Sequence, residues 1–275
     1  MKKLLSLVSI VLVGLLVACN GEDANDNDVT VVTVGVVGAF QQQWDVVNEN
    51  LAPYNIRVQL ENFTDFTTPN TMLAAGETDL NAFQNIGFLN NAIANNGYEI
   101  TPIGVTFIAP LNVFANFDRI STIADLAEGD EVGIPSDLTN GGRALKVLEA
   151  AGLIVMDPEV GFLGTEADII DNPSGIIIRP AESATLPSLL PDLAAAVINS
   201  QNARTGGLDL IEDSIFLEDS LNLEIADHLV NVIVARTDEV DNEIFARIVE
   251  AYQTAEVARI MEAEFGGIAA FEYAD

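Results

Sequence analysis

The sequence predicts an α/β protein in which two units of alternating strands and helices enclose a cleft. Short segments rich in β-branched residues alternate with segments that carry helix start and stop signals, and the alternation resumes after a break near Pro110. The chain has 275 residues, of which 49% are hydrophobic. This length and composition suffice for one large domain or two lobes with substantial cores.

The first unit opens with segment 29–37, which is apolar, β-branched and followed by Gly38, as a buried strand would be. Segment 56–63 alternates between polar and apolar residues, which favours a half-exposed strand. Segment 68–76 begins with Thr-Pro and closes on a glycine, the usual punctuation of a helix. The patterns predict strands at residues 29–37, 56–63, 79–83 and 100–107, and helices at 39–50, 68–76 and 87–96.

The second unit repeats the alternation, and a further strand and helix close the chain. Because pockets between domains are favoured ligand sites, we expect a ligand cleft between the two units. We predict strands at residues 110–117, 130–135, 175–179, 193–199 and 229–236, helices at 139–151, 184–190 and, as one long helix, 243–265, and short helical segments at 123–126 and 168–173.

The beginning of the chain indicates export and a lipid anchor. Residues 1–18 combine a basic start, an apolar stretch and a small residue at the end, which is the pattern of a signal peptide. The apolar stretch is shorter than the roughly 20 residues that a membrane-spanning helix needs. The run Leu16-Val-Ala-Cys19 resembles the bacterial lipobox, so we predict that Cys19 is acylated; the alternative is an incidental thiol. Residues 19–28 are polar and are predicted to form a flexible acidic tether.

The chain is strongly acidic, with 42 acidic and 11 basic residues and a formal net charge of −31. This charge argues against nucleic acid and anionic lipid surfaces as partners. Since Cys19 is the only cysteine, a disulfide within the chain is impossible. We hypothesise that the protein works in high salt, which screens its self-repulsion; a generally acidic proteome is the alternative.

The motifs of catalysis and metal binding are missing from the sequence. His228 is the only histidine, and neither a Gly-x-Ser-x-Gly elbow nor a Gly-x-x-x-x-Gly-Lys-Ser/Thr loop is present. Metal sites rich in His and Cys are excluded as well. We therefore predict a protein that is not an enzyme and uses no metal or cofactor, with His228 in a structural or surface position.

Arg143 is a candidate for binding a carboxylate. It follows Asn140-Gly-Gly at the start of a predicted helix. Free N–H groups at a helix start and a guanidinium group together suit a carboxylate. The alternative is a surface salt bridge with one of the many acidic residues.

Asparagines and phenylalanines near strand and helix ends form a second group of candidates. Asn199 ends one apolar strand and Asn231 interrupts another. A buried asparagine needs hydrogen-bond partners, which are either ligand atoms or the backbone of a turn. Phe66, Phe83 and Phe88 either line an apolar pocket or belong to the core.

Two segments, Asn81-Ala-Phe-Gln84 and Asn140-Gly-Gly-Arg143, carry the most specific resemblance to a known family, and several other segments support it more weakly. The sequence resembles the NlpA lipoprotein family, whose MetQ-type members bind methionine for ABC importers. The resemblance runs in order over almost the whole mature chain. The weaker segments are the lipobox, Val34-Gly-Val36, Pro69-Asn70, the remainder of 76–84 and of 135–144, Gly152-Leu-Ile154, Ala196-Val-Ile-Asn199, Val230-Asn-Val-Ile-Val234 and Ala251-Tyr-Gln253.

The resemblance implies a type II periplasmic-binding-protein fold, whose two α/β lobes close on a free amino acid. Lobe 1 would comprise residues 29–109 and 229–275, and lobe 2 residues 110–228. Arg143 would hold the ligand carboxylate with Asn140 beside it. The polar end of the ligand would bind Asn199 and Asn231, and its thioether would lie among Phe66, Phe83 and Phe88, because sulfur and aromatic rings attract each other.

The resemblance further implies a receptor anchored by lipid on the extracytoplasmic side of a cell membrane. It would pass methionine or a related amino acid to an ABC permease driven by a separate ATPase. We expect the receptor to be a monomer. The alternative is a membrane-anchored adhesin or scaffold that kept the fold and lost transport.

The predicted pocket departs from the family pattern at three positions. Asn85 replaces a histidine that family members usually carry, and Phe66 and Phe88 replace tyrosines that are common there. We count Asn85 among the ligand-binding residues. Because a pocket that loses a hydrogen-bonding group can change its preferred ligand, a different apolar amino acid or a short peptide remains an alternative to methionine.

Overall fold

The computed structural model describes residues 29–219 and 226–272. The predicted signal peptide, the acylation site Cys19 and the tether lie outside these residues. Within the described parts of the chain, no helix has both the length and the hydropathy needed to cross a membrane.

Lobe 1 is built on a mixed five-stranded sheet whose strand order is β2-β1-β3-β13-β4. Its first three strands are parallel, because each is connected to the next through a helix. The last strand to enter, β13, runs antiparallel to both of its neighbours, β3 and β4. The strands are β1 (Thr30–Val37), β2 (Ile56–Phe63), β3 (Leu80–Asn85), β4 (Ile100–Val105) and β13 (Asn231–Arg236).

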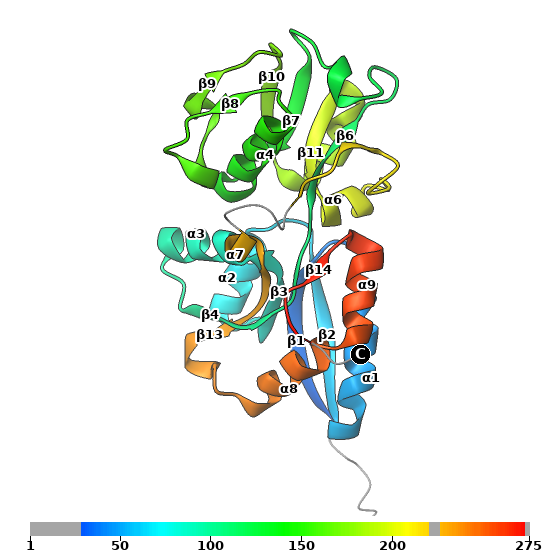
Figure 1. Cartoon of the computed structure of the whole chain (residues 1–275). Coiled ribbons are helices and arrows are strands. Elements are labelled where there is room, and N and C mark those ends of the chain that lie inside the picture. Colours follow the sequence, from blue (N-terminus) through cyan, green and yellow to red (C-terminus); the bar gives the residue numbers. More distant parts are fainter. Residues whose placement is uncertain (1–28, 220–225, 273–275) are drawn as a thin grey trace, which may run out of the picture.

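Helices cover both faces of this sheet (Figure 1), so its central strands β3 and β13 are mostly buried on both sides, whereas the edge strand β2 alternates buried and exposed residues. Trp44 of the first helix, Phe245 and Phe265 belong to a core on one face. Leu73 and Leu89 belong to a smaller core on the other. The helices on the first face are α1 (Gln43–Leu51), α8 (Glu243–Tyr252) and α9 (Ala255–Phe265); those on the second are α2 (Thr68–Ala75) and α3 (Ile86–Asn96), with the short α7 (Ala226–Leu229) against α3.

Lobe 2 contains a second five-stranded sheet, in the order β10-β7-β11-β6-β12. One core lies between this sheet and helix α4, and another lies beneath helices α5 and α6. The strands are β6 (Leu111–Ala115), β7 (Glu131–Pro135), β10 (Ile177–Ala181), β11 (Ala195–Asn199) and β12 (Ser214–Phe216); the helices are α4 (Leu138–Ala150), α5 (Leu186–Leu189) and α6 (Ser200–Thr205).

Smaller elements complete the two lobes. Strand β5 (Phe107–Ile108) pairs with β14 (Ile268–Ala269), and β8 (Val155–Met156) pairs with β9 (Ile169–Asp171). Single turns of 3-10 helix occupy Ala52–Tyr54, Ile123–Asp125, Gly161–Leu163, Glu166–Asp168, Ser183–Thr185, Leu190–Asp192 and Thr237–Glu239.

The chain passes from one lobe to the other between β5 and β6 and again between β12 and β13 (Figure 1). Two sheets with helices on their faces confirm the predicted α/β class with two lobes. The residue limits that we set for the lobes remain predictions.

The structure corrects three of the predicted elements. The strand expected over 100–107 is two strands in different sheets, because β4 ends at Val105 and β5 pairs with β14. The single helix expected over 243–265 is two helices, because Gln253 leaves the helical region and the Thr254 hydroxyl accepts a hydrogen bond from the N–H of Val257 at 3.4 Å, which starts α9. The helical segment expected at 168–173 is wrong as well. There, Asp168 closes a turn with Thr165, and the chain then continues as strand β9.

Candidate ligand-binding site

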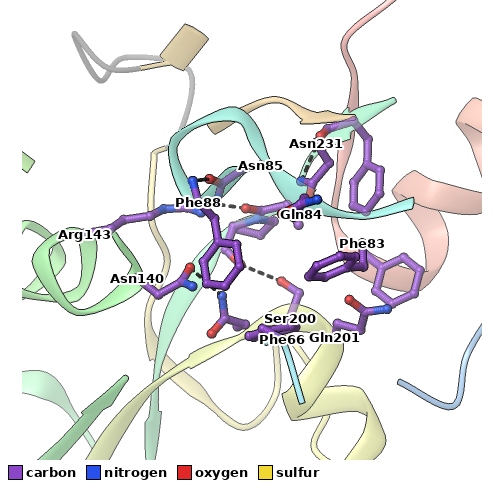
Figure 2. A pocket seen from close by; sticks show the side chains of 15 residues that line it. Phe66, Phe83, Gln84, Asn85, Phe88, Asn140, Arg143, Ser200, Gln201 and Asn231 are labelled. Atoms are coloured by element: carbon purple, nitrogen blue, oxygen red, sulfur yellow. Dashed lines mark hydrogen bonds between the residues drawn. The ribbon is translucent and has the colours of Figure 1, made fainter. Parts of the chain in front are cut away.

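A cavity of about 50 Å³ lies between the two lobes. Lobe 1 contributes the end of β3, the start of α3 and the loop before α2, while lobe 2 contributes the start of α4 and the end of β11 (Figure 2). All of the predicted ligand-binding residues line this cavity. These residues are Phe66, Phe83, Asn85, Phe88, Asn140, Arg143, Asn199 and Asn231.

Three phenylalanine rings form the apolar wall of the cavity on the lobe 1 side. The rings of Phe66 and Phe83 are nearly parallel, with centroids 6.1 Å apart and an interplanar angle of 16°. Phe88 stands edge-on to both of them, with centroids at 6.2 Å. These rings therefore offer an apolar, polarizable surface without a hydroxyl group.

Arg143 lies deep in lobe 2, and its side chain is only 4% exposed. Its Nε donates to Oε1 of Glu218 at 2.7 Å, and its Nη2 donates to the carbonyl of Ala109 at 2.8 Å and also to Oε2 of Glu218. Among the described residues, none accepts a hydrogen bond from Nη1. This nitrogen is therefore the one that can meet a ligand carboxylate.

The sequence did not single out Glu218, the buried partner of Arg143. Its carboxylate is 3% exposed and also accepts a hydrogen bond from the N–H of Leu111 at 2.9 Å. The alternative of an ion pair for Arg143 is thus correct in kind, although the pair is buried rather than at the surface. With 42 acidic residues in the chain, no sequence signal marked this one.

The expectation of free N–H groups at the start of α4 is wrong for Asn140. Asp137 caps the helix, and its Oδ1 accepts from the backbone N–H of Asn140 at 2.8 Å. The side-chain amide of Asn140 also donates to Asp137, at 3.1 Å. Aspartate is a strong N-cap, so the chain itself supplies the anion that a ligand would otherwise provide. Asp137, two residues before the predicted helix 139–151, was the available signal.

The remaining amides of the site are partly engaged with the protein. Asn199 donates to Oδ1 of Asn140 at 3.0 Å, and its own buried Oδ1 has no partner among the described residues. Asn231 donates to the carbonyl of Phe107 at 3.0 Å. Asn85 accepts from the N–H of Phe88 at 2.8 Å and so caps α3 (Figure 2). The oxygen of Asn199 is the group most in need of a donor from a ligand.

A buried amide cluster explains part of the Asn81-Ala-Phe-Gln84 segment. Asn70 of α2 and Gln84 of β3 exchange hydrogen bonds of 2.7 and 2.6 Å, and Asn81 donates to Asn70 at 3.1 Å. This cluster links α2 to β3. Gln84, together with Ser200 and Gln201 of α6, also lines the cavity, and sequence reasoning missed all of these as cavity residues.

The comparisons with known proteins agree with this architecture. Residues 32–271 match the family described as NlpA lipoprotein. The chain is 35% identical to the probable D-methionine-binding lipoprotein MetQ of Vibrio cholerae, over 97% of this chain and 96% of that protein. It is 37% identical to outer membrane lipoprotein 3 of Mannheimia haemolytica, over 92% of each.

Solved structures give the same result. The crystal structure of the methionine binding protein MetQ superposes with a TM-score of 0.82 at 35% identity, covering 88% of this chain and 98% of that one. A nutrient binding protein from Burkholderia cenocepacia bound to methionine superposes with a TM-score of 0.80 at 30% identity, covering 87% and 100%. The resemblance predicted from the sequence is confirmed.

Proposed function

The chain belongs to the NlpA lipoprotein family, and on that premise we propose that it is a lipid-anchored receptor that binds methionine or a related amino acid for an ABC importer. Its relatives are binding proteins, and we propose likewise that this chain performs no covalent chemistry. One observation carries the proposal. A cavity between the lobes combines an aromatic wall with a buried arginine.

The cavity suggests how an amino acid would be held. Nη1 of Arg143 would donate to the ligand carboxylate, while Glu218 and Ala109 hold the other guanidinium nitrogens in place. The unpartnered oxygen of Asn199 would accept from the ligand ammonium group. The ligand side chain would extend toward the rings of Phe66, Phe83 and Phe88.

The preferred ligand depends on the aromatic wall and on Asn85. A thioether suits three phenylalanine rings, since each sulfur–aromatic contact contributes about 0.3–1.5 kcal/mol. The amide oxygen of Asn85 already caps α3, so this residue offers a ligand fewer free groups than a histidine would. We therefore propose methionine first, and other apolar amino acids as weaker ligands.

The proposed anchor gives the receptor its place in transport. Acyl chains on Cys19 would keep it at the extracytoplasmic surface of the membrane. A polar tether would hold it near its permease at a high effective concentration. We propose that it acts there as a monomer and that a separate ATPase drives import.

A thermal-shift screen tests the proposal. The mature chain carrying Cys19→Ala is melted alone, with each of the twenty amino acids, and with D-methionine. A ligand that binds the folded state raises the melting temperature, because at a hundred times its Kd it adds about 2.7 kcal/mol to the free energy of unfolding. We expect the largest shift with methionine. No shift with any amino acid would contradict the receptor and favour the adhesin or scaffold.

A further inference from the structure

Helix α6 belongs to lobe 2 but reaches across to lobe 1. It starts where β11 ends, so Ser200 and Gln201 line the cavity between the lobes. One turn later, Arg204 and Thr205 face lobe 1. In Figure 1 this helix stands directly above α9, at the side of the molecule away from α3.

Arg204 makes two contacts with lobe 1. Its Nη2 donates to Oε2 of Glu264 on α9 at 2.7 Å. Its guanidinium also lies 4.9 Å from the ring centroid of Phe40, in the loop between β1 and α1. The side chains of Arg204 and Glu264 are 28% and 22% exposed. Neither residue lines the cavity.

Two further hydrogen bonds connect α6 to the same loop of lobe 1. The side-chain amide of Gln201 donates to the carbonyl of Val37, and the hydroxyl of Thr205 accepts from the N–H of Ala39 at 3.3 Å. The close approach depends on Gly38, whose φ of 90° favours glycine. A Cβ atom at this position would lie 2.7 Å from Cγ of Gln201.

We propose that α6 is a latch that holds the lobes closed, and that Arg204 and Glu264 set ligand affinity without touching the ligand. The apparent Kd of a ligand rises as the population of the binding-competent state falls. Contacts that form in the closed state therefore add to affinity. The proposal rests on the proposed function, because the closed state matters to the cell only if a ligand is enclosed.

The matched control comes from lobe 1 itself. Arg247 on α8 donates to Glu250 at 2.6 Å and lies 4.4 Å from the ring centroid of Tyr54. It thus makes the same kinds of contact as Arg204, but within one lobe. Replacing it removes an ion pair and a cation–π contact without affecting how the lobes meet.

The experiment compares four single variants, Arg204→Ala, Arg204→Glu, Glu264→Ala and Arg247→Ala, with the exchanged pair Arg204→Glu plus Glu264→Arg. Isothermal titration with methionine gives each Kd, and small-angle X-ray scattering without ligand gives the separation of the lobes. An ion pair and a cation–π contact at a partly exposed site together correspond to about a 3- to 30-fold change in Kd. We expect this weakening, with a larger radius of gyration, for Arg204→Ala.

We expect a smaller loss for Glu264→Ala, which keeps the contact with Phe40, and partial recovery in the exchanged pair compared with Arg204→Glu alone. Arg247→Ala should bind like the wild type. Equal Kd values and scattering for Arg204→Ala and Arg247→Ala would overturn the latch. If the wild type binds no amino acid, the proposed function fails, and the ligand-free scattering of the same two variants still decides the latch.

Discussion

The buried pair of Arg143 and Glu218 allows a sharp test of how the cavity is built. We expect Glu218→Ala to lower the free energy of unfolding substantially. The substitution removes the acceptor of the 2.7 Å hydrogen bond from Nε of Arg143 and of the 2.9 Å bond from the N–H of Leu111. The side chains of Arg143 and Glu218 are at most 4% exposed, so water cannot readily replace these bonds. Among the described residues, only the carbonyl of Ala109 then still accepts a hydrogen bond from Arg143.

The magnitude follows from the charge that is left behind. Two unit charges about 4 Å apart attract by about 4 kcal/mol at an effective dielectric constant of 20. Measured losses for one partner of a buried pair are about 3–5 kcal/mol. We therefore expect about 3–5 kcal/mol, read from urea unfolding followed by circular dichroism at pH 7.

The double variant Arg143→Met with Glu218→Leu is the companion measurement. It removes both charges, so most of the lost stability should return. Methionine binding should not return, because Nη1 of Arg143 is gone. A loss below about 1 kcal/mol for Glu218→Ala, or a double variant no more stable than the single, would refute this reasoning. A double variant that still binds methionine like the wild type would refute Arg143 as the carboxylate anchor.

Three further outcomes are expected. Because the net charge is −31, the melting temperature should rise with NaCl concentration, and a maximum at low salt would contradict adaptation to salt. In Gly35→Ala, the new Cβ would lie 2.4 Å from Oδ1 of Asn81 and would disturb the amide cluster. Urea unfolding should therefore show a free energy of unfolding lower by about 1–3 kcal/mol. A variant as stable as the wild type would mean that the cluster adapts. Burial raises the pKa of the Tyr252 phenol, so the neutral phenol contributes stability that is fully present below pH 10 and is lost as the pH rises further. The free energy of unfolding of Tyr252→Phe should therefore fall less steeply with pH above pH 10 than that of the wild type. The same pH dependence in both proteins would argue against this group.

The fold was largely predictable because glycine and proline residues mark the ends of many of its strands and helices. Strand β2 follows its alternating pattern over Ile56–Phe63, and α2 begins at Thr68 beside Pro69. The break between α8 and α9 was missed since it has neither residue. Instead, Gln253 leaves the helix and Thr254 caps the next one, within an apolar repeat that continues on both sides.

The site was predictable where residues stand at the ends of strands and helices. Asn85 ends β3 and Asn199 ends β11, so the topology brings both to the cavity. Glu218 was not predictable, because it lies 75 residues from Arg143 in the sequence and resembles any other acid of the chain. The same holds for Arg204 and Glu264, which meet only through the relative position of the lobes.

The position of β13 in the first sheet has a consequence for the order in which the protein assembles. The strands of lobe 2 come from one uninterrupted stretch, residues 111–216, whereas β13 enters the other sheet only at Asn231. Until then β3 keeps an open edge, and β4, among the described strands of its sheet, has no partner at all. As the chain emerges from its N-terminus, the stretch 111–216 can therefore complete the sheet of lobe 2 before the sheet of lobe 1 is complete. Lobe 1 thus begins first along the chain but completes its sheet last, after the sheet of lobe 2 has formed.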